Sequence, residues 1–420
     1  MRYAFLDFLA CQACHSQLAC FTARERSAPI PAGPYNPGAR ISAGPGLGPL
    51  PEASAHEGTG CAARRRTFAQ FSTPAADQKR NFEVEIVSGV LLCAACGRWY
   101  PIVGELPEIL PDHLRTFDTD AAAIRESAAM MPRARADAAL AFRPSSVASD
   151  DGARYKQAEM SIKEKVQDAD FFGPGYSSPF NPWDPEFTLH LVSLFGIVQR
   201  VLELKKGEAL LDSGCGYAWT TEWFHRAGVP VVGVDITRTY LDIALERLGP
   251  SRPHLVVGDV EHLPLRDDIF DAVLAYESFH HLPDRQRAMA AYDRVLGPGG
   301  RVVLAEPGGA HETERVAMDV MQKYGILERG MEIDDVHAYA AGTSLKRVEQ
   351  IFLARATAED LGARLDPEFL TRRNVVVEDH LFKLTKRGVA VGPVRLQARR
   401  RMWPLVKAHV KAALLRVGLD

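Results

Sequence analysis

The sequence has little of what marks several large classes of protein. No stretch approaches 18 uncharged apolar residues, so we expect no membrane-spanning helix. The formal net charge is only −3, which argues against a general polyanion binder. Seven cysteines in 420 residues are too few, and odd in number, for a disulfide framework. The first residues lack the unbroken apolar run of a signal peptide, so we expect a reducing, cytoplasmic location.

What is present indicates a globular chain of several parts. It is 46% hydrophobic and 25% charged, and it is longer than the roughly 100–200 residues of one domain. The composition changes along the chain and predicts four regions. Residues 1–111 form a cysteine-containing domain with a Pro/Gly-rich insertion at about 22–80, and residues 112–200 form a helical linker and lid. Residues 201–387 form an α/β domain, and residues 388–420 form a basic extension.

The third region has the pattern of an α/β fold. Short apolar runs alternate there with amphipathic stretches, which is typical of a parallel sheet covered by helices on both faces. We predict strands at 209–212, 229–235, 254–259, 270–276 and 300–307, and two more near 347–353 and 380–385.

Four of the cysteines form two Cys-x-x-Cys pairs, Cys11/Cys14 and Cys93/Cys96. Two such pairs can place four thiolates at the corners of a tetrahedron, the geometry of a structural zinc site. Two unrelated pairs of reduced cysteines are the alternative. A closed four-thiolate site has no open position for substrate, so we expect this module to stabilise and cover an apolar face of its neighbour rather than to do chemistry.

The residues around these pairs carry a resemblance. LDFLACQACHSQL and LLCAACGRWYPIVGELPEIL resemble, over about forty residues in two pieces, the small zinc-ribbon activator subunit of tRNA, rRNA and release-factor methyltransferases. The resemblance implies a zinc-ribbon domain in which Cys11, Cys14, Cys93 and Cys96 hold the metal.

A second pattern surrounds the first predicted strand of the α/β region. Asp212 ends that strand, and Gly214 and Gly216 follow, where glycine lets the backbone turn tightly and approach a ligand. Asp235 ends the next strand, where a carboxylate can accept both ribose hydroxyls of a nucleoside. Asp259 follows the third strand and could receive the amine of adenine. A nicotinamide-binding fold is the alternative, but it would need a third glycine where this chain has Trp219.

The segments DSGCGYA, VGVDIT, GDVEHLPLRDDIFDAV and LAYESFHHLPDRQRAMAAYDRVLGPGGRVVLAEPG resemble, in order and spacing, the class I S-adenosylmethionine-dependent methyltransferases of the ubiquinone/menaquinone type. The resemblance covers about 200–310. It implies a Rossmann-like core of seven strands, the last reversed, and S-adenosylmethionine as cofactor. It also implies which residues contact the cofactor. Asp212, Gly214 and Gly216 would line its methionine and ribose side, and Asp235 and Ile236 would hold the ribose and adenine. Asp259 and Val260 would hold the base, and Tyr276 would lie under the sulfonium.

Candidate catalytic residues follow the fourth predicted strand. The chain does not have there the Asn-Pro-Pro-Tyr of enzymes that methylate amino groups on bases or amides, and the local titratable side chains are Glu277, His280 and His281. We expect His280 to face the substrate as a general base. For His281, which many relatives share, packing or capping is the alternative. Glu306, which ends the fifth strand, either contacts substrate or supports a turn.

Three functions remain open at this stage. The first is O-methylation of a small-molecule or carbohydrate acceptor. The second is tRNA methylation with a fused activator, and the third is a non-catalytic cofactor-binding scaffold. Residues 372–420 hold twelve basic and three acidic residues, which suit RNA phosphates, a solvated helix face or peripheral contact with an anionic membrane. We favour the first function. An aromatic run of Phe171, Phe172, Tyr176, Phe180 and Trp183 is expected to form part of a lid, with packing of a helix on the core as the alternative.

Overall fold

The computed structural model describes residues 1–27, 84–142, 152–162, 179–180, 185–249, 253–351 and 380–387. Most of the predicted insertion at 22–80, four of the five lid aromatics and the basic extension at 388–420 lie outside the described residues. Within this range, residues 1–387 form one compact unit. None of the described helices is both long and apolar enough to cross a membrane.

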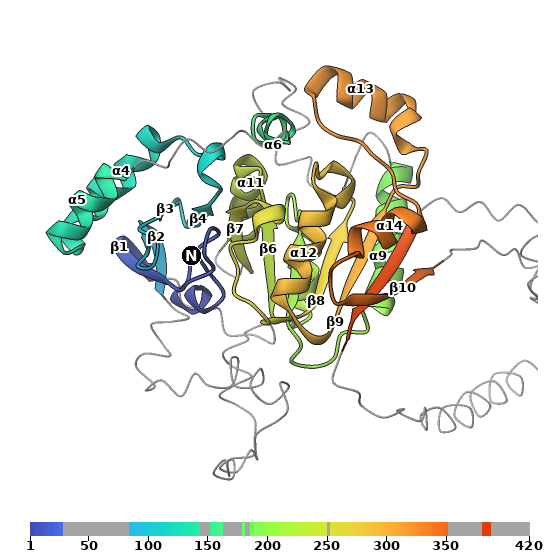
Figure 1. Ribbon diagram of the computed structural model, residues 1–420, viewed down its shortest axis with the longest axis horizontal. Helices are drawn as coiled ribbons and strands as arrows, with labels where there is room; N and C mark the ends of the chain where they lie inside the picture. The colour runs from blue at the N-terminus through green and yellow to red at the C-terminus, as the bar shows by residue number, and fades with distance from the viewer. Residues whose placement is uncertain are drawn as a thin grey trace, which may run out of the picture. The chain divides into compact units, whose positions relative to one another are not determined.

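One sheet of eleven strands organises this unit, in the order β1-β2-β3-β4-β7-β6-β5-β8-β9-β11-β10 (Figure 1). Seven of the strands form the predicted α/β core: β5 (Leu210–Ser213), β6 (Val231–Asp235), β7 (His254–Gly258), β8 (Phe270–Tyr276), β9 (Leu296–Glu306), β10 (Leu345–Ile351) and β11 (His380–Lys386). The first five are parallel, and β11 runs antiparallel to both β9 and β10. The predicted seven-stranded core with a reversed last strand is therefore confirmed.

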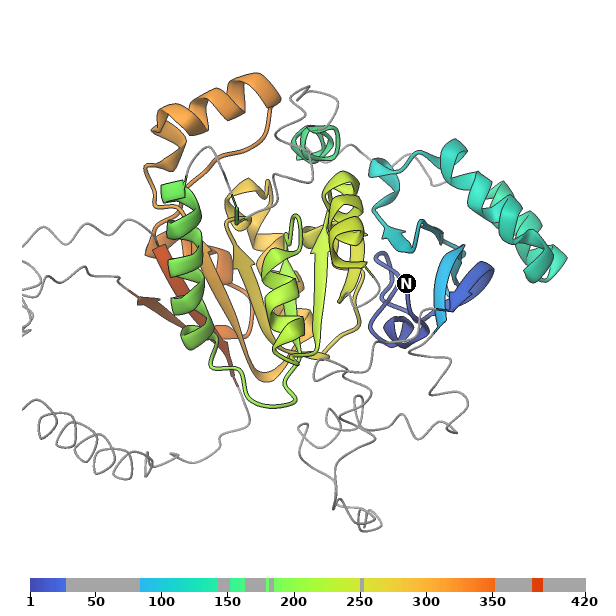
Figure 2. The same ribbon diagram turned by 180° about the vertical axis from the view of Figure 1, so that it is seen from behind.

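Helices cover both faces of this core because alternate strand residues are apolar on opposite sides. Leu210 packs in a cluster with α9 and α10, whereas Leu211 packs in the cluster that contains α12. The views in Figures 1 and 2 show these helices on opposite sides of the sheet. The covering helices are α9 (Pro185–Leu202), α10 (Trp219–Arg226), α11 (Arg238–Leu248), α12 (Arg285–Val295) and α14 (Ile333–Ala340).

The N-terminal module is a small antiparallel sheet. The 3₁₀ helix η1 (Tyr3–Asp7) precedes four strands, β1 (Leu18–Ser27), β2 (Val84–Cys93), β3 (Trp99–Val103) and β4 (Leu106–Ile109). Strand β1 corrects one expectation, because residues 22–27 of the expected insertion belong to a strand. Ser27 pairs with Val84 of β2, a partner that the local composition does not reveal.

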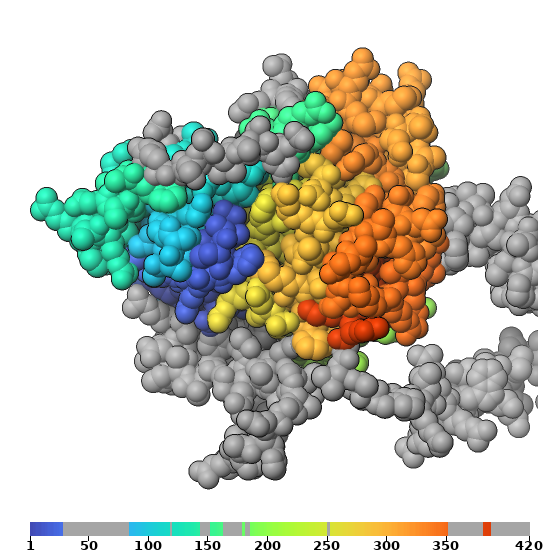
Figure 3. Space-filling view, viewed as in Figure 1, coloured from blue at the N-terminus to red at the C-terminus, as the bar shows by residue number. Residues whose placement is uncertain are grey.

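The module and the core share one sheet. Strand β4 pairs in parallel with β7, with Glu108 opposite Val257. On one face of this junction the Phe5 ring stacks on the His254 ring with 4.7 Å between centroids. The Ala10 amide donates to the Pro264 carbonyl at 2.9 Å. In the space-filling view the module, in blue and cyan, directly abuts the yellow part of the core (Figure 3).

Apart from α9, the described helices of the predicted linker and lid divide between two places. Helices α4 (Phe117–Ser127) and α5 (Arg133–Ala141) pack on Trp99 and other apolar side chains of the N-terminal module, and the Trp99 indole donates to the Ala139 carbonyl at 2.9 Å. Helix α6 (Ala153–Met160) and helix α13 (Arg315–Tyr324) lie at the top of Figure 1, above the ends of the strands. Of the described helices in the predicted linker and lid, α6 thus occupies the place expected for a lid, and α13 joins it from the predicted α/β region.

Candidate active site

The loop after β5 has a backbone that favours glycine. Gly214 and Gly216 have φ angles of +68° and +50°, in the left-handed region. A Cβ at Gly214 would lie 2.5 Å from the Cβ of Ser278, which follows β8. The loop after β5 and the loop after β8 therefore approach each other as closely as backbone allows, and a ligand that reaches this place meets exposed main chain.

Asp235, at the end of β6, is held by backbone donors of that loop. One carboxylate oxygen accepts from the Gly216 amide at 2.8 Å and the other from the Thr237 amide at 2.7 Å. Burial nevertheless raises the pKa of Asp235 to about 6. The group is ionised at neutral pH, and each oxygen keeps a lone pair for a further donor such as a ribose hydroxyl.

Asp212 is placed differently from our expectation. Its carboxylate accepts hydrogen bonds from the hydroxyls of Thr220 and Thr221 in the first turn of α10, the former at 2.6 Å. It is 1% exposed and does not line the cavity. Burial raises its pKa to about 6. Asp212 therefore fixes the helix to the strand behind the glycine loop rather than facing a ligand.

Tyr276, expected beneath the sulfonium, also turns away from the cavity. Its hydroxyl donates to the Leu191 carbonyl of α9 at 2.7 Å, and its ring packs edge-on against Phe195 and Trp219. The reason is strand alternation, because the side chain of the last β8 residue points to the face that α9 covers. The next residue, Glu277, faces the cavity instead.

A cavity of about 560 Å³ lies at the carboxyl ends of the strands, within the range of roughly 300–1,000 Å³ usual for small-molecule sites. Six of the eight predicted cofactor residues line it, namely Gly214, Gly216, Asp235, Ile236, Asp259 and Val260. A second wall comes from α6 and the residues after it, from α13 and from the segment after α13. Its apolar members are Ile162, Val316, Val320, Tyr324 and Ile326, and its charged members are Lys156, Glu159, Asp319, Lys323 and Glu328.

Lys156 of α6 is a cavity residue that the sequence did not reveal. Its ammonium, on a side chain 4% exposed, donates to the carboxylates of Asp259, at 2.8 Å, and Glu261. Burial opposes the charge of Asp259, but hydrogen bonds from His262 and Lys156 hold the pKa of that carboxyl below its usual value. Asp259 is thus ionised, although Lys156 and His262 both already contact one of its oxygens.

His280 does not have the surroundings of a general base. It is 4% exposed and does not line the cavity. Its Nδ1 lies 2.7 Å from Glu306 and its Nε2 lies 3.3 Å from Glu328. Burial disfavours the charged ring, but the hydrogen bonds to these two carboxylates raise the pKa of His280 to about 10. A ring with both nitrogens facing carboxylates has no free lone pair for a substrate proton.

His281 has the opposite arrangement and lines the cavity. Its Nδ1 lies 2.6 Å from the Leu327 carbonyl, and because a carbonyl only accepts, Nδ1 must carry the hydrogen. In the neutral ring, Nε2 then has a lone pair. Burial, followed by the adjacent charge of His280, lowers the pKa of His281 to about 4.

Glu277 adopts an uncommon backbone conformation for a residue with a side chain. Its φ is +50°, and its amide donates to the Ala305 carbonyl of β9 at 2.9 Å. Left-handed residues of this kind cost of order 1–3 kcal/mol and persist where the surroundings hold them. The turn leads the chain from β8 to the cavity, which Glu277 and Ser278 both line.

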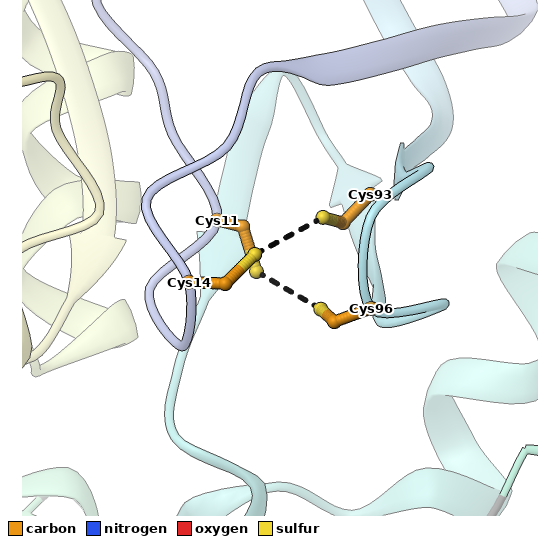
Figure 4. Close-up of side chains that lie close together, drawn as sticks. All are labelled: Cys11, Cys14, Cys93 and Cys96. Carbon is orange, nitrogen blue, oxygen red and sulfur yellow. Dashed lines mark hydrogen bonds between the residues drawn. The ribbon is translucent and has the colours of Figure 1, made fainter.

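The four paired cysteines come together in the N-terminal module (Figure 4). Cys11 and Cys96 have sulfurs 3.5 Å apart, as do Cys14 and Cys93, and all four sulfurs lie within 4.8 Å of one another. Four ligands on bonds of about 2.3 Å would stand about 3.8 Å apart, so this donor set fits a tetrahedral zinc ion. The Tyr100 hydroxyl, 3.2 Å from the Cys11 sulfur, can donate to a thiolate there.

Some site residues had a sequence signal and others had none. Glu306 stands at the tip of a predicted strand, which is where α/β proteins place functional groups. Lys156 and Glu328 lie in an unremarkable helix and a loop, and only the folded chain brings them to the cavity.

Two family models match the chain. Residues 211–304 match a family described as a methyltransferase domain, and residues 2–105 match the Trm112p-like protein family. The two matches cover the cavity-forming core and the cysteine module separately.

Individual proteins are similar over part of the chain. Methyltransferase GfsG of Streptomyces halstedii is 32% identical over 145 residues, 33% of this chain and 52% of that protein. The 27-O-demethylrifamycin SV methyltransferase of Amycolatopsis mediterranei is 36% identical over 197 residues, 40% of this chain and 72% of that protein. The chain thus spans about half the length of the first relative and nearly three quarters of the second.

Among solved structures, a complex between the Haloferax volcanii Trm112 methyltransferase activator and a methyltransferase aligns with a TM-score of 0.37 and 17% identity. The alignment covers 49% of this chain and 95% of that one.

Proposed function

We propose that this chain, which belongs to the S-adenosylmethionine-dependent methyltransferases, transfers the methyl group to an oxygen of a small molecule or sugar. The observation that carries the proposal is the composition of the cavity of about 560 Å³ at the strand ends. It joins the glycine loop and Asp235, which suit the nucleoside donor, to His281, which has a lone pair on Nε2. Methylation of a hydroxyl needs a group that removes its proton as the carbon–oxygen bond forms.

The donor side of the cavity can be assigned residue by residue. The ribose hydroxyls would donate to Asp235, whose two oxygens are already oriented by backbone amides. Ile236 and Val260 offer apolar contact for adenine, and Asp259 lies next to Val260. Bound there, S-adenosylmethionine supplies an electrophilic methyl group, and the chain's own task is to align the acceptor and exclude water.

The acceptor side has apolar residues between charged ones, since Asp319 and Lys323 of α13 also line it. Helix α13 presents Val316 and Val320 to the cavity, and Val316 is 74% exposed. An exposed apolar residue at a cavity rim suits an acceptor with a hydrocarbon portion. The names of two relatives, the 27-O-demethylrifamycin SV methyltransferase and the Penicillium expansum O-methyltransferase cnsE, support oxygen as the methyl-accepting atom.

Binding of S-adenosylhomocysteine by titration calorimetry is the first test. We expect a saturable heat for the wild-type chain and a loss of affinity in Asp235→Ala. The second test supplies isotopically labelled S-adenosylmethionine with a panel of phenols, polyols and glycosides, and looks for the mass of one added methyl. Saturable binding of another nucleotide with no binding of the donor or its product would refute the proposal.

Methylation of tRNA is the second candidate, because residues 2–105 match the Trm112p-like protein family and residues 372–420 are strongly basic. The basic segment lies mostly outside the described residues, so its phosphate or membrane contacts rest on sequence alone. Filter binding of bulk tRNA across a salt series separates the two candidates. Affinity that falls steeply with salt, together with label in tRNA, would favour the second; no tRNA binding at low salt would exclude it.

For the N-terminal module we propose a structural zinc ion on Cys11, Cys14, Cys93 and Cys96. The sulfur separations and the absence of an open ligand position within this set support it. Thiolate ligands require a reducing compartment, which is consistent with the cytoplasm. Metal analysis of undenatured protein tests the proposal, with one zinc per chain on these cysteines expected.

A further inference from the structure

A second cluster of metal-ligating side chains lies beside the cavity. His280 follows β8, His311 belongs to the 3₁₀ helix η7 (His311–Thr313) after β9, and Glu328 lies in the segment after α13. The Nε2 atoms of the two histidines lie 3.3 Å and 2.9 Å from the same oxygen of Glu328. The three donor atoms lie within 4.8 Å of one another. Adjacent ligands of an ion with bonds of about 2.1 Å stand about 3 Å apart, so these spacings suit coordination.

The outer nitrogens of both histidines are arranged as in metal sites. The Nδ1 of His280 lies 2.7 Å from Glu306, and the Nδ1 of His311 lies 3.0 Å from Glu314. A histidine that ligates a metal through Nε2 usually donates its Nδ1 hydrogen to a carboxylate or carbonyl, which fixes the tautomer and the ring orientation. Here two histidines show this arrangement and direct Nε2 at one carboxylate.

The charge around the cluster also favours a cation. The carboxylates of Glu306, Glu314 and Glu328 outnumber the two imidazoles, so the cluster stays negative even with both rings protonated, and a metal ion on Nε2 would displace those protons. Glu277 adds a further negative charge close enough to affect His280. Two nearby guanidinium groups donate to backbone carbonyls, Arg285 to that of His280 and Arg329 to that of Leu282. A divalent ion would offset this charge.

A comparison within the same chain shows what a filled cluster looks like. Asp259, Glu261 and His262 also bring three ligand-type atoms together. There the Lys156 ammonium donates to both carboxylates, so a side-chain cation already occupies the centre. Between His280, His311 and Glu328 the structure records no lysine or arginine contact among the described residues.

We propose that His280, His311 and Glu328 bind a divalent transition-metal ion at the wall of the cavity. Two imidazoles and one carboxylate suit Mn²⁺, Fe²⁺, Co²⁺ or Zn²⁺, and three protein ligands leave positions open for an exogenous oxygen. Glu328 lines the cavity together with His281, so an ion here would lie within reach of an acceptor group. The ion would bind the acceptor oxygen next to the His281 base. That role rests on the proposed methyl transfer, whereas metal binding by these three residues does not depend on it.

The test uses Mn²⁺ as the probe, on full-length protein whose cysteine site is kept loaded with zinc, because thiolates select softer ions. Paramagnetic resonance of free Mn²⁺ measures binding. We expect one saturable Mn²⁺ per chain, no saturable binding in Glu328→Gln, and affinity about tenfold weaker in Glu314→Gln, which removes only an outer carboxylate. His337→Ala, an exposed histidine of α14 outside the cluster, is the matched control and should bind as wild type.

Two outcomes would overturn the site: wild-type protein that binds no Mn²⁺, Co²⁺ or Zn²⁺ beyond the cysteine-bound equivalent, or Glu328→Gln that binds as tightly as wild type. The nearly isosteric Glu→Gln change and an unaltered melting temperature guard against loss of fold. Calorimetry with S-adenosylhomocysteine on protein free of added Mn²⁺ separates the two proposals. Donor-product binding without metal binding leaves methyl transfer intact and refutes only the metal site.

Discussion

His280 and His281 are neighbours in the chain but have different surroundings, and this difference bears on the chemistry. His280 has carboxylates at both nitrogens, whereas Nδ1 of His281 meets a backbone carbonyl. At this scale the orientation of one ring decides whether a side chain can accept a proton. We therefore move the proposed base from His280 to His281.

We predict that His281→Ala lowers kcat by roughly 10²–10⁴-fold, the usual contribution of a general base. The affinity for S-adenosylhomocysteine should change little, because the proposed donor contacts come from Asp235 and the glycine loop. Steady-state kinetics with the identified acceptor, together with calorimetry, measure both. A variant that keeps kcat within threefold of wild type would contradict the base assignment.

The raised pKa of Asp235 predicts a pH dependence of donor binding. As the pH falls through about 6 the carboxylate gains a proton and becomes a poorer acceptor for ribose hydroxyls. The dissociation constant for S-adenosylhomocysteine should therefore rise, by at most about tenfold per pH unit. Calorimetry at pH 7.5 and 5 tests this, with Asp235→Asn as control: it should bind weakly and with a much smaller difference between the two values.

The same carboxyl has an opposite effect on stability. Its pKa is higher in the folded chain than in the unfolded chain, so the folded state binds the proton more tightly. Its contribution to the free energy of unfolding therefore becomes more favourable as the pH falls from about 6 toward 4. Above pH 6 the buried carboxylate destabilises the folded chain by its full amount. Denaturant titrations without the donor measure this effect. The Asp235→Asn variant should lose this part of the pH dependence of the free energy of unfolding.

At the scale of elements, the pairing of β4 with β7 makes the N-terminal module an extension of the core sheet. Apolar residues from both sides, such as Phe5, Leu9 and Phe270, belong to one buried cluster. A module joined in this way should unfold with the core rather than before it. Strand β4 thus pairs with the edge of the core sheet that β7 forms, so among the described strands β7 has a neighbour on both sides.

Phe5→Ala tests this junction. The ring is 1% exposed and stacks on His254, so its removal should cost about 3–5 kcal/mol. We expect scanning calorimetry to show a single transition that moves to lower temperature. Val103→Ala, at an exposed position of β3, is the control and should leave the transition nearly unchanged. Two separate transitions, of which only one moves, would contradict a shared core.

At the scale of the whole molecule, the cysteine site and the cavity have separate tasks. None of the four paired cysteines lines the cavity, and their module contributes stability through the shared sheet. Loss of zinc should therefore reduce folding stability more than it reduces donor affinity measured on protein that is still folded.

Cys14→Ser tests this separation. We expect it to lose the bound zinc and to melt at a lower temperature, while its affinity for S-adenosylhomocysteine well below that temperature stays close to wild type. Cys20→Ser, which changes a partly buried cysteine outside the four-sulfur group, should keep one zinc. Metal analysis, melting curves and calorimetry are the measurements. Zinc retained by Cys14→Ser would contradict the assigned ligand set.

The sequence by itself determined the features that depend on local spacing. The strands of the core, the glycines that need left-handed backbone and the two cysteine pairs could all be read from residues close together in the chain. Tertiary structure decided the features that depend on distant partners and on strand faces. Asp212 meets threonines of α10, Tyr276 turns toward α9, and His280 lies between Glu306 and Glu328. A side chain's charge and free lone pairs depend on those partners, which folding alone brings into contact.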